Sequence, residues 1–563
     1  MLSRELVLKH ALKNAWEYGK ADIRAVTGKV LAAAPEAKKD MRATLALIAE
    51  VVAEVNALPR EEIEARLSAF TFPERKEEAR GIVLPHAERG KVVTRFPPEP
   101  NGWPHIGHAK AAFLDYEAAR AYGGKFLLRF DDTNPEAERQ EYVDAIIDGL
   151  SWLGISWDGA ITYASDFLPS LYEYGKKLLA QGDAYVCACP PEEIRKNRAA
   201  GKPCACRRGG AEHIELFNEL LAGKFSEGEA VVRFVGDMQS PNTAMRDPTL
   251  FRIVEVPHYR QGEKYRLWPT YDFEAPILDS LQGVTHAMRT KEYELRDELY
   301  VSLLRRLGLR IPFIVEFSRL SLLGFPVSKR LLKPLVDEGK VRGWDDPRLP
   351  TLAGLRRRGI QPEAIRRFVL SFGLGKTESE PTIEALLAEN RKLLDPLAPR
   401  YFFVPEPVRL VVQNAPTLIA ELRKHPSAEL GVRKAATRGE FLIPGSDAAA
   451  LKPGEVFRLK DLYNVRVVSV SEKEVKGEFA GRELTEGSRK LQWVSEPLDC
   501  TVLVPHELFV GDRFNEKSLE EINGVCERAA GELKPGDIIQ FERFGFCKLE
   551  EKKEKLTFIY TNP

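Results

Sequence analysis

A strand, a proline-rich turn, a helix and a second strand follow one another in the first quarter of the chain, and this order constrains the fold most. Residues 91–96 read as a β-rich strand, 106–122 as a helix and 125–130 as a second strand. Such an order forms a βαβ unit of a parallel sheet. Active residues of such sheets lie at the carboxyl ends of the strands, and Arg95 and Asp131 occupy those ends.

The chain differs from this unit on both sides. Before it, apolar residues recur at a spacing of three to four and predict one buried helix face in a small bundle; they are Leu45, Ile48, Val52, Val55 and Leu58. From about residue 400, short β-branched strands alternate with turn residues, which is typical of β-barrels. A chain of 563 residues exceeds what one core supports, so we expect several domains.

Charge and composition exclude only a few classes of function. The 83 basic and 83 acidic residues cancel, so a nucleic-acid partner would have to rely on a local basic surface. No apolar run reaches the roughly 18 residues that span a bilayer, and the N-terminus does not resemble a signal peptide. We therefore expect a cytoplasmic protein without a membrane partner.

Two histidines three residues apart open the predicted helix. His105 and His108 share one helix face, and a helix N-terminus attracts phosphate. Gly107 between them lets a planar base approach the backbone. Together they predict an ATP site in which the histidines donate hydrogen bonds to a five-coordinate α-phosphate. The alternative is a pair of surface histidines at a helix start.

A lysine far along the chain offers a second phosphate ligand. Ser328 and Lys329 lie in the segment 326–330, where an ammonium group can neutralise charge on a leaving pyrophosphate. Such a segment alone is typical of a solvated surface turn. Its position after a second stretch of alternating strands and helices favours a mobile loop that binds ATP.

Longer segments resemble a known family. The chain is similar to glutaminyl-tRNA synthetases and archaeal-type glutamyl-tRNA synthetases at residues 95–110, 128–135, 268–273, 316–320 and 343–348. This likeness extends from about residue 90 to the end. The segment 326–330 resembles the KMSKS-type loop of these enzymes, with Val327 in place of the usual methionine and Lys329 retained.

The resemblance implies a multidomain α/β fold of the class I synthetases. Its parts would be a Rossmann-like parallel sheet, an acceptor-binding insertion, helical domains and a C-terminal β-barrel region that binds the anticodon. The expected domains are an N-terminal helical domain (1–88), the first half of the catalytic domain (89–185), the insertion (186–265), the second catalytic half with the KMSKS-like loop (266–330), a helical connecting domain (331–398) and the β-barrel region (399–563).

The implied reaction needs no protein nucleophile. The carboxylate of the amino acid attacks the α-phosphate of ATP, pyrophosphate leaves, and the 3′-terminal hydroxyl of tRNA attacks the mixed anhydride. Mg²⁺ is expected with ATP. The implied catalytic residues are His105, His108, Ser328 and Lys329. The implied ATP contacts are Glu99, Pro100, Asn101, His105, Gly107, His108, Lys110, Thr290, Arg319, Leu320, Val327, Ser328 and Lys329.

The amino acid expected in the pocket is L-glutamate. By resemblance, Asp131 would hold its α-ammonium group, and Arg95 and Tyr271 would contact its side chain. Arg289 aligns where glutamyl enzymes carry arginine and glutaminyl enzymes carry cysteine. A second guanidinium group favours an anionic substrate over a neutral amide, in agreement with that alignment.

Four of the seven cysteines lie within twenty residues, as Cys187, Cys189, Cys204 and Cys206. Four thiolates in two close pairs suit tetrahedral zinc in a reducing compartment. We expect one structural Zn²⁺ in the insertion, with no open position for catalysis. The alternative is a group of buried free cysteines.

The implied macromolecular partner is tRNA(Glu), and the sequence leaves open whether tRNA(Gln) is also charged. Arginines at 356–358 and 366–367 predict contacts with RNA phosphates, although a solvated helix face is the alternative. No DNA partner is expected.

Three other interpretations remain open at this point. Arg289 could be a structural arginine paired with Asp279 or Glu292, and the chain could then be a glutaminyl-tRNA synthetase. A nucleotidyltransferase shares the histidine-bearing helix but needs neither a barrel region nor an amino-acid pocket. A non-catalytic RNA-binding paralogue would have no reason to keep His105, His108 and Lys329 together.

Overall fold

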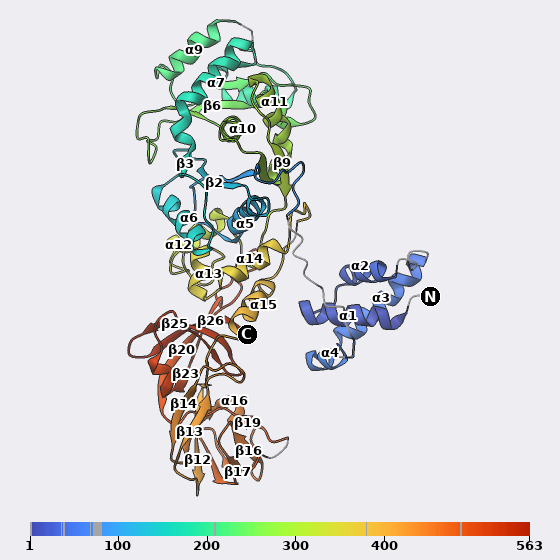
Figure 1. The fold of residues 1–563 in the computed structure, drawn as a ribbon, viewed down its shortest axis with the longest axis vertical. Helices are drawn as coiled ribbons and strands as arrows, with labels where there is room; N and C mark the ends of the chain where they lie inside the picture. The colour runs from blue at the N-terminus through green and yellow to red at the C-terminus, as the bar shows by residue number, and fades with distance from the viewer. Residues whose placement is uncertain are drawn as a thin grey trace. The chain divides into compact units, whose positions relative to one another are not determined.

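The computed structural model describes residues 3–34, 37, 40–67, 69–70, 82–207, 210–378, 380–484 and 487–563. The chain divides into two compact units, Met1–Arg80 and Gly81–Pro563. Figure 1 shows the smaller unit as blue helices and the larger one from blue to red.

Helices alone build the described part of the smaller unit: α1 (Arg4–Tyr18), α2 (Ile23–Ala33), α3 (Met41–Asn56) and α4 (Arg60–Leu67). The predicted apolar face is only partly correct. Ile48 and Val55 are fully buried, whereas Leu45 is 42% exposed. With 3.6 residues per turn, Leu45 lies about 60° around the helix from Ile48 and falls at the edge of the buried arc.

A parallel sheet lies in the larger unit. Its strands are β1 (Val93–Phe96), β2 (Lys125–Phe130), β3 (Thr162–Tyr163), β8 (His286–Thr290) and β9 (Phe313–Phe317). β1 pairs in parallel with β2, β2 with β3, and β8 with β9. The two groups meet where the backbone N–H of Thr285 donates to the carbonyl oxygen of Val93 at 2.9 Å.

The helix α5 (Ile106–Ala121) connects β1 to β2, so the predicted βαβ unit is confirmed. Its buried side packs with the sheet and with α14 (Pro362–Leu370) in one apolar core. Phe113 of α5, Phe130 of β2 and Phe368 of α14 belong to that core. The helix that begins at the histidines is therefore fixed on two sides.

The segment between the two halves of this sheet forms a sheet of its own. Four antiparallel strands pair in chain order: β4 (Ala184–Cys187), β5 (Val231–Phe234), β6 (Thr249–Ile253) and β7 (Leu267–Pro269). The accompanying helices are α7 (Leu168–Gln181), α8 (Pro191–Ala199) and α9 (Glu212–Leu221). The helix α6 (Gln140–Trp152) lies between β2 and β3 and packs in the same apolar core as α5. The chain then returns to the parallel sheet through α10 (Tyr271–Leu281) and α11 (Asp297–Leu307).

Helices and then strands complete the chain. The helices are α12 (Lys329–Asp337), α13 (Leu352–Arg358), α14 and α15 (Ile383–Leu394). Two large sheets follow, with strand orders β10-β24-β25-β26-β20-β23-β11 and β15-β12-β18-β17-β16-β19, and they confirm the predicted β-rich C-terminal region (Figure 1).

The elements of this region have the following bounds: β10 Arg400–Tyr401, β11 Phe403–Pro405, β12 Pro407–Gln413, β13 Leu418–Arg423, β14 Val432–Thr437, β15 Glu440–Pro444, α16 Gly445–Ala449, β16 Val456–Leu459, β17 Asn464–Val470, β18 Glu474–Phe479, β19 Lys490–Leu491, β20 Pro497–Pro505, β21 Phe509–Val510, β22 Arg513–Phe514, β23 Leu519–Glu527, β24 Ile538–Phe541, β25 Gly545–Lys552 and β26 Leu556–Asn562.

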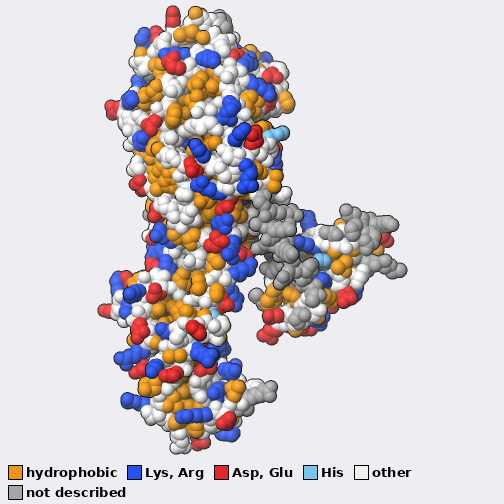
Figure 2. All heavy atoms as spheres, in the orientation of Figure 1, with side chains coloured by type: hydrophobic (Ala, Val, Ile, Leu, Met, Phe, Trp, Pro, Cys, Tyr) orange, Lys and Arg blue, Asp and Glu red, His pale blue; other side chains and the backbone are white. Residues whose placement is uncertain are grey.

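Two further features concern the charge of the surface and the length of the helices. On the face in Figure 2, basic and acidic side chains are interspersed, as the zero net charge of the sequence suggests. Within the described ranges, no helix has both the length and the apolar character needed to cross a bilayer.

Candidate active site

The start of α5 holds both histidines of the predicted phosphate site. His105 is the N-cap residue of the helix, and His108 lies in its first turn. The backbone N–H of Gly107 donates to Nδ1 of His105 at 3.1 Å, and the backbone N–H of His105 donates to Nδ1 of His108 at 3.2 Å. The backbone of the helix start therefore fixes both rings, whose centroids lie 4.0 Å apart.

These contacts also determine where each ring carries its proton. Burial lowers the pKa of His105 well below its ordinary value and that of His108 to about 4, so both rings are neutral at pH 7. Because each Nδ1 accepts a backbone N–H, each proton lies on Nε2. The pair thus offers two N–H donors, which suit the oxygen atoms of a phosphate.

Gly107 keeps the space beside these rings open. A Cβ atom at this position would lie 2.9 Å from Cε1 of His105 and 3.5 Å from the carbonyl oxygen of Leu320. The ring of His105 would have to move, whereas the contact with Leu320 is of ordinary length. Glycine is therefore required at position 107 for steric reasons, in addition to the predicted approach of a planar base to the backbone.

Lys329 approaches the same region from the first position of α12. Its ammonium group donates a hydrogen bond to the carbonyl oxygen of Asn101 and lies 4.8 Å from the ring centroid of Tyr142. Ser328 is the N-cap residue, and among the described residues its hydroxyl makes no capping hydrogen bond. Lys329 thus lies beside the loop that leads into the histidines, which is the proximity that the prediction requires.

Polar residues predicted to bind ATP lie at the ends of several elements. Arg319 follows β9 and pairs with Glu292 at 3.0 Å. Glu99 is exposed in the proline-rich loop and accepts a hydrogen bond from Nδ2 of Asn134 at 3.4 Å. Thr290 ends β8 and is the N-cap residue of a 3₁₀ helix. These groups come from both halves of the parallel sheet.

Four of the predicted ATP contacts are buried. Lys110 is 1% exposed, and its ammonium group donates to the carbonyl oxygen of Ser318 at 2.6 Å. Burial lowers the pKa of this lysine to about 8. Pro100, Leu320 and Val327 are also buried. In this structure Lys110 therefore ties α5 to the end of β9.

A buried ionic network surrounds the predicted amino-acid pocket. Arg95 and Arg129 both donate to Oδ1 of Asp279, each at 2.9 Å. Arg129 also pairs with Asp131 at 2.6 Å, although burial still raises the pKa of that carboxyl group. Tyr300 donates to the other oxygen of Asp279 at 2.9 Å. Arg95 and Asp131 are thus linked through shared partners.

Arg289 sits on β8 among aromatic rings. Its guanidinium carbon lies 5.0 Å from the ring centroid of Tyr293, 5.2 Å from that of Tyr300 and 5.8 Å from that of Tyr271. Nη1 donates to Oδ1 of Asp297 at 2.8 Å. Nε is buried and has no hydrogen-bond partner among the residues that the structure describes. A bound ligand could therefore supply the acceptor that this buried donor lacks.

The suggested structural partners of Arg289 are wrong. Asp279 pairs with Arg95 and Arg129, and Glu292 pairs with Arg319. The actual partner is Asp297, which was not among the predicted partners. The sequence feature that could have identified Asp297 is its position at the start of a helix, eight residues after the arginine on the preceding strand.

Glu274 is a second residue that sequence reasoning missed. It is fully buried in the first turns of α10, and within the described chain neither carboxyl oxygen has a hydrogen-bond partner. Burial, together with the nearby carboxyl group of Asp131, raises its pKa well above the ordinary value. The acid stands directly before the apolar run 275–278, which hid its proximity to the pocket.

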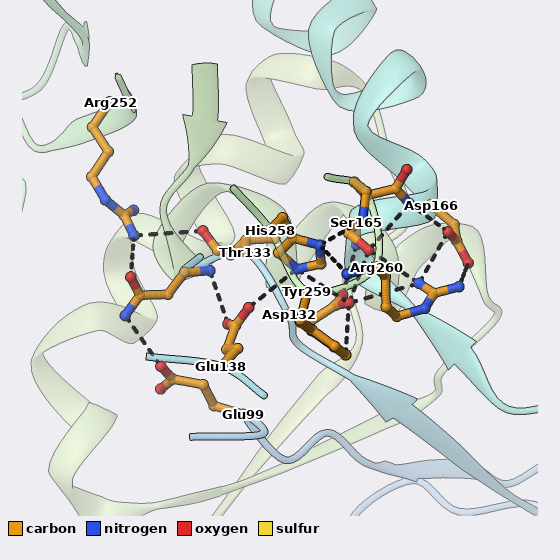
Figure 3. Close-up of polar contacts among 12 residues, drawn as sticks. Glu99, Asp132, Thr133, Glu138, Ser165, Asp166, Arg252, His258, Tyr259 and Arg260 are labelled. Atoms are coloured by element: carbon orange, nitrogen blue, oxygen red, sulfur yellow. Dashed lines mark hydrogen bonds and ion pairs between the residues drawn. The ribbon is translucent and has the colours of Figure 1, made fainter. Parts of the chain in front are cut away.

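A buried cluster of two acids and one histidine begins with Asp132, the residue that follows Asp131. In Figure 3 the ring of His258 lies between the carboxyl groups of Asp132 and Glu138, with Nε2 at 3.6 Å and 3.4 Å from their nearer oxygens. Burial raises the pKa of Asp132 to about 7 and that of Glu138 to about 9. Ser165 donates to Asp132 through both its backbone N–H and its hydroxyl (Figure 3). This cluster fixes the loop that follows β2.

The four clustered cysteines are brought together in the insertion, but not equally. The sulfur atoms of Cys187, Cys189 and Cys206 all lie within 4.8 Å of one another. Those of Cys189 and Cys206 are 3.6 Å apart. The sulfur of Cys204 lies outside this group and accepts a hydrogen bond from Arg233 at 3.1 Å. Zinc–sulfur bonds of about 2.3 Å place tetrahedral thiolates about 3.8 Å apart, so three cysteines fit a zinc ion.

The arginine clusters predicted to bind RNA are largely engaged within the protein. Arg357 pairs with Glu550 and Asp345, and Arg356 pairs with Asp148. The guanidinium groups of the second cluster pair with acids, as Arg366 with Glu117 and Glu363 and Arg367 with Glu363. Arg358 is buried. These residues present less free positive charge than the sequence suggests.

Comparison with known proteins agrees with this arrangement. Residues 91–396 match the family described as tRNA synthetases class I (E and Q), catalytic domain, and residues 398–485 and 490–550 match two anticodon-binding domains of the same group. The chain is 45% identical to the glutamate–tRNA ligase of Nitrosopumilus maritimus, over 98% of both chains. It is 43% identical to that of Pyrococcus abyssi, over 99% of both.

A solved glutamate–tRNA synthetase from Elizabethkingia anophelis is similar over 55% of this chain and 71% of that one, at 22% identity and a TM-score of 0.41. The sequence matches to the family cover both the parallel sheet with its histidine-bearing helix and the C-terminal strands. The chain belongs to the class I (E and Q) tRNA synthetases.

Proposed function

We propose that this chain attaches L-glutamate to tRNA(Glu) in two steps, through glutamyl-adenylate, and releases AMP and pyrophosphate. The observation that carries the choice of amino acid is Arg289, whose buried Nε has no partner in the described chain. A buried, incompletely paired cation favours an anionic side chain and penalises a neutral amide. The relatives described above, which are named glutamate–tRNA ligases, support the same choice.

The phosphate chemistry falls to the start of α5 and to Lys329. The Nε2–H groups of His105 and His108 would donate to oxygens of the α-phosphate as the carboxylate of glutamate attacks it. Lys329 would leave its contact with Asn101 and neutralise charge on the departing pyrophosphate. Ser328, with its hydroxyl not used as a cap, would donate to the same group. Of the remaining predicted ATP residues, those that are not buried would line the nucleotide site; they are Glu99, Asn101, Gly107, Thr290 and Arg319. Lys110, Pro100, Leu320 and Val327 would support the site from the core.

In the amino-acid pocket, Asp131 would bind the α-ammonium group of glutamate. Arg289, Tyr271 and Arg95 would contact the side-chain carboxylate, and the contacts of Arg95 with Asp279 and with the carbonyl oxygen of Met288 would hold its guanidinium group in place. This arrangement places opposite charges at the two ends of the substrate. It therefore selects both the length and the charge of the amino acid.

Two metal ions accompany this proposal. Mg²⁺ would bind with ATP and neutralise its phosphates. A structural zinc would be held by Cys187, Cys189 and Cys206, with Cys204 beside them, and would stabilise the insertion without taking part in the reaction. A role in translation also favours the cytoplasmic location expected from the sequence.

Charging assays test this function directly. Purified tRNA(Glu) and tRNA(Gln) would be incubated with ATP and either labelled glutamate or labelled glutamine. We expect glutamate to be attached to tRNA(Glu) and glutamine to neither tRNA. Charging with glutamine alone would refute the proposal, while glutamate on tRNA(Gln) would extend its partners to both tRNAs.

A further inference from the structure

Arg289 of the amino-acid pocket is held by a single carboxylate. Oδ1 of Asp297, at the first position of α11, accepts the 2.8 Å hydrogen bond from Nη1 of Arg289. Arg289 is 3% exposed at its side chain and Asp297 25%. The acid is therefore the more exposed member of the pair, and its hydrogen bond engages only Nη1 of the guanidinium group.

A second acid lies next to this pair. Arg289 and Glu316 are register partners on the parallel strands β8 and β9, so their side chains lie on the same face of the sheet. Glu316 is bound by the ammonium group of Lys376, which also lies 3.3 Å from Glu294. The acids Asp297 and Glu316 thus have one basic partner each among the described residues, Arg289 and Lys376 respectively. Of these two acids, Asp297 is the one that accepts a hydrogen bond from Arg289.

This crowding changes the acidity of Asp297. Burial and the neighbouring carboxylate of Glu316 raise its pKa to about 6, although Arg289 and Lys376 oppose the shift. Asp297 would therefore gain a proton in mildly acidic solution. Burial raises the pKa values of Tyr271, Tyr293 and Tyr300, the rings around the guanidinium group, so these remain neutral there.

We propose that Asp297 is a positioning residue that sets the specificity of the pocket: it orients Arg289 and offsets part of its positive charge. This inference rests on the proposed function, in which Arg289 meets the side-chain carboxylate of glutamate. An arginine without such a partner could rotate among three tyrosine rings and lose its alignment. An arginine with a neutral partner would keep its alignment and attract the substrate carboxylate more strongly.

Two variants separate orientation from charge. Asp297→Asn keeps an oxygen that can accept the hydrogen bond from Arg289 but removes the negative charge. Asp297→Ala removes both. Asp183→Asn and Asp183→Ala are the matched controls. Asp183 pairs with Arg306, which lies near the C-terminal end of α11, so these variants break another Arg–Asp pair in the same way. Glutamate-dependent pyrophosphate exchange would be measured in the presence of tRNA(Glu), between pH 5.5 and 8.

We expect Asp297→Ala to raise the KM for glutamate at least ten-fold and to leave the KM for ATP unchanged. Asp297→Asn should lower the KM for glutamate several-fold at pH 8. In the unmodified enzyme this KM should fall as the pH drops through 6, because Asp297 becomes neutral while glutamate keeps its side-chain charge. The Asn variant should lose that inflection.

Other results would overturn the proposal. They are an unchanged KM for glutamate in the Ala variant, equal effects of the Asn and Ala variants, and an inflection near pH 6 that survives in the Asn variant. Bound ATP, measured for each variant, shows that the site is folded. Failure of the unmodified enzyme to charge glutamate would instead refute the proposed function, so the two failures are distinguishable.

Discussion

The ammonium group of Lys329 donates a hydrogen bond to the carbonyl oxygen of Asn101, and this contact joins the start of α12 to the loop before α5. The two phosphate-binding segments are separated by more than two hundred residues in sequence. Their meeting in space makes the role of the lysine testable without disturbing the histidines.

Lys329→Ala should lower the rate constant of glutamate-dependent pyrophosphate exchange by about a hundred-fold, since a charge that acts on the leaving group is lost. The KM for glutamate should change little. Lys333→Ala is the matched control, because Lys333 lies one turn further along α12 and pairs only with Asp337 among the described residues. Equal rates in the two variants would argue against the assignment of Lys329.

Arg289→Cys should reduce kcat/KM for glutamate by about a hundred-fold, because a buried charged contact to the substrate is lost. ATP affinity should remain unchanged. Arg305→Cys, an exposed position on α11, is the control. Steady-state kinetics with glutamate and glutamine provide the measurement, and unchanged glutamate kinetics would remove the reason for choosing this amino acid.

Gly107→Ala should impair catalysis through sterics. The added Cβ would lie 2.9 Å from the ring of His105, so the ring must move from its N-cap position. We expect at least a ten-fold loss in the rate of pyrophosphate exchange with the fold retained. Gly28→Ala places its Cβ where no atom lies within 4 Å in the described structure, and this control should keep full activity.

The buried cluster of Figure 3 should make stability depend on pH. The folded-state pKa values of Asp132 (about 7) and Glu138 (about 9) lie above those of the unfolded chain. The folded protein therefore binds more protons above about pH 4, and this stabilising contribution is lost as pH rises through 7 and then 9. Stability in this region should fall with rising pH.

Glu138→Gln removes the larger part of that dependence. The amide oxygen can still accept the hydrogen bond from the backbone N–H of Asn134. We expect the thermal midpoint at pH 8 to rise by about 2–4 °C, and the difference from the unmodified protein to vanish near pH 4. Glu141→Gln on the exposed side of α6 should leave both midpoints unchanged. A destabilised Gln variant at pH 8 would contradict the predicted sign.

Elemental analysis tests the metal site. Protein purified without chelators should contain about one zinc per chain, and Cys189→Ser should lose most of it. Cys500→Ser lies in the C-terminal strands and should keep its zinc. Absence of stoichiometric zinc in the unmodified protein would support free thiols in the insertion instead.

The sequence predicted most reliably what depends on local order. The strand and helix that frame His105 follow from periodicity and turn residues, and the structure has them at 93–96 and 106–121. The side-chain partners could not be predicted, because they come from distant segments. Asp279 pairs with both Arg95 and Arg129, and the spacing of these residues in the sequence does not predict that they share one partner.

Burial was the second property that the sequence concealed. Lys110 looks like a surface lysine on a helix, yet the core between α5 and the end of β9 encloses it. Glu274 looks like a solvated acid in a first helical turn, yet it is fully enclosed. The arginines of 356–358 look like an RNA-binding cluster, but acids from other segments pair with two of them. Tertiary packing decides each of these cases.

The backbone contacts at the start of α5 have one more consequence. The N–H groups of His105 and Gly107 occupy the Nδ1 atoms of both rings before any nucleotide arrives, and burial keeps the rings uncharged. The two donors are therefore preorganised: neither a tautomer exchange nor a protonation step has to precede phosphate binding. These histidines should impose no pH limit on the reaction at neutral pH, and any such limit must come from other groups.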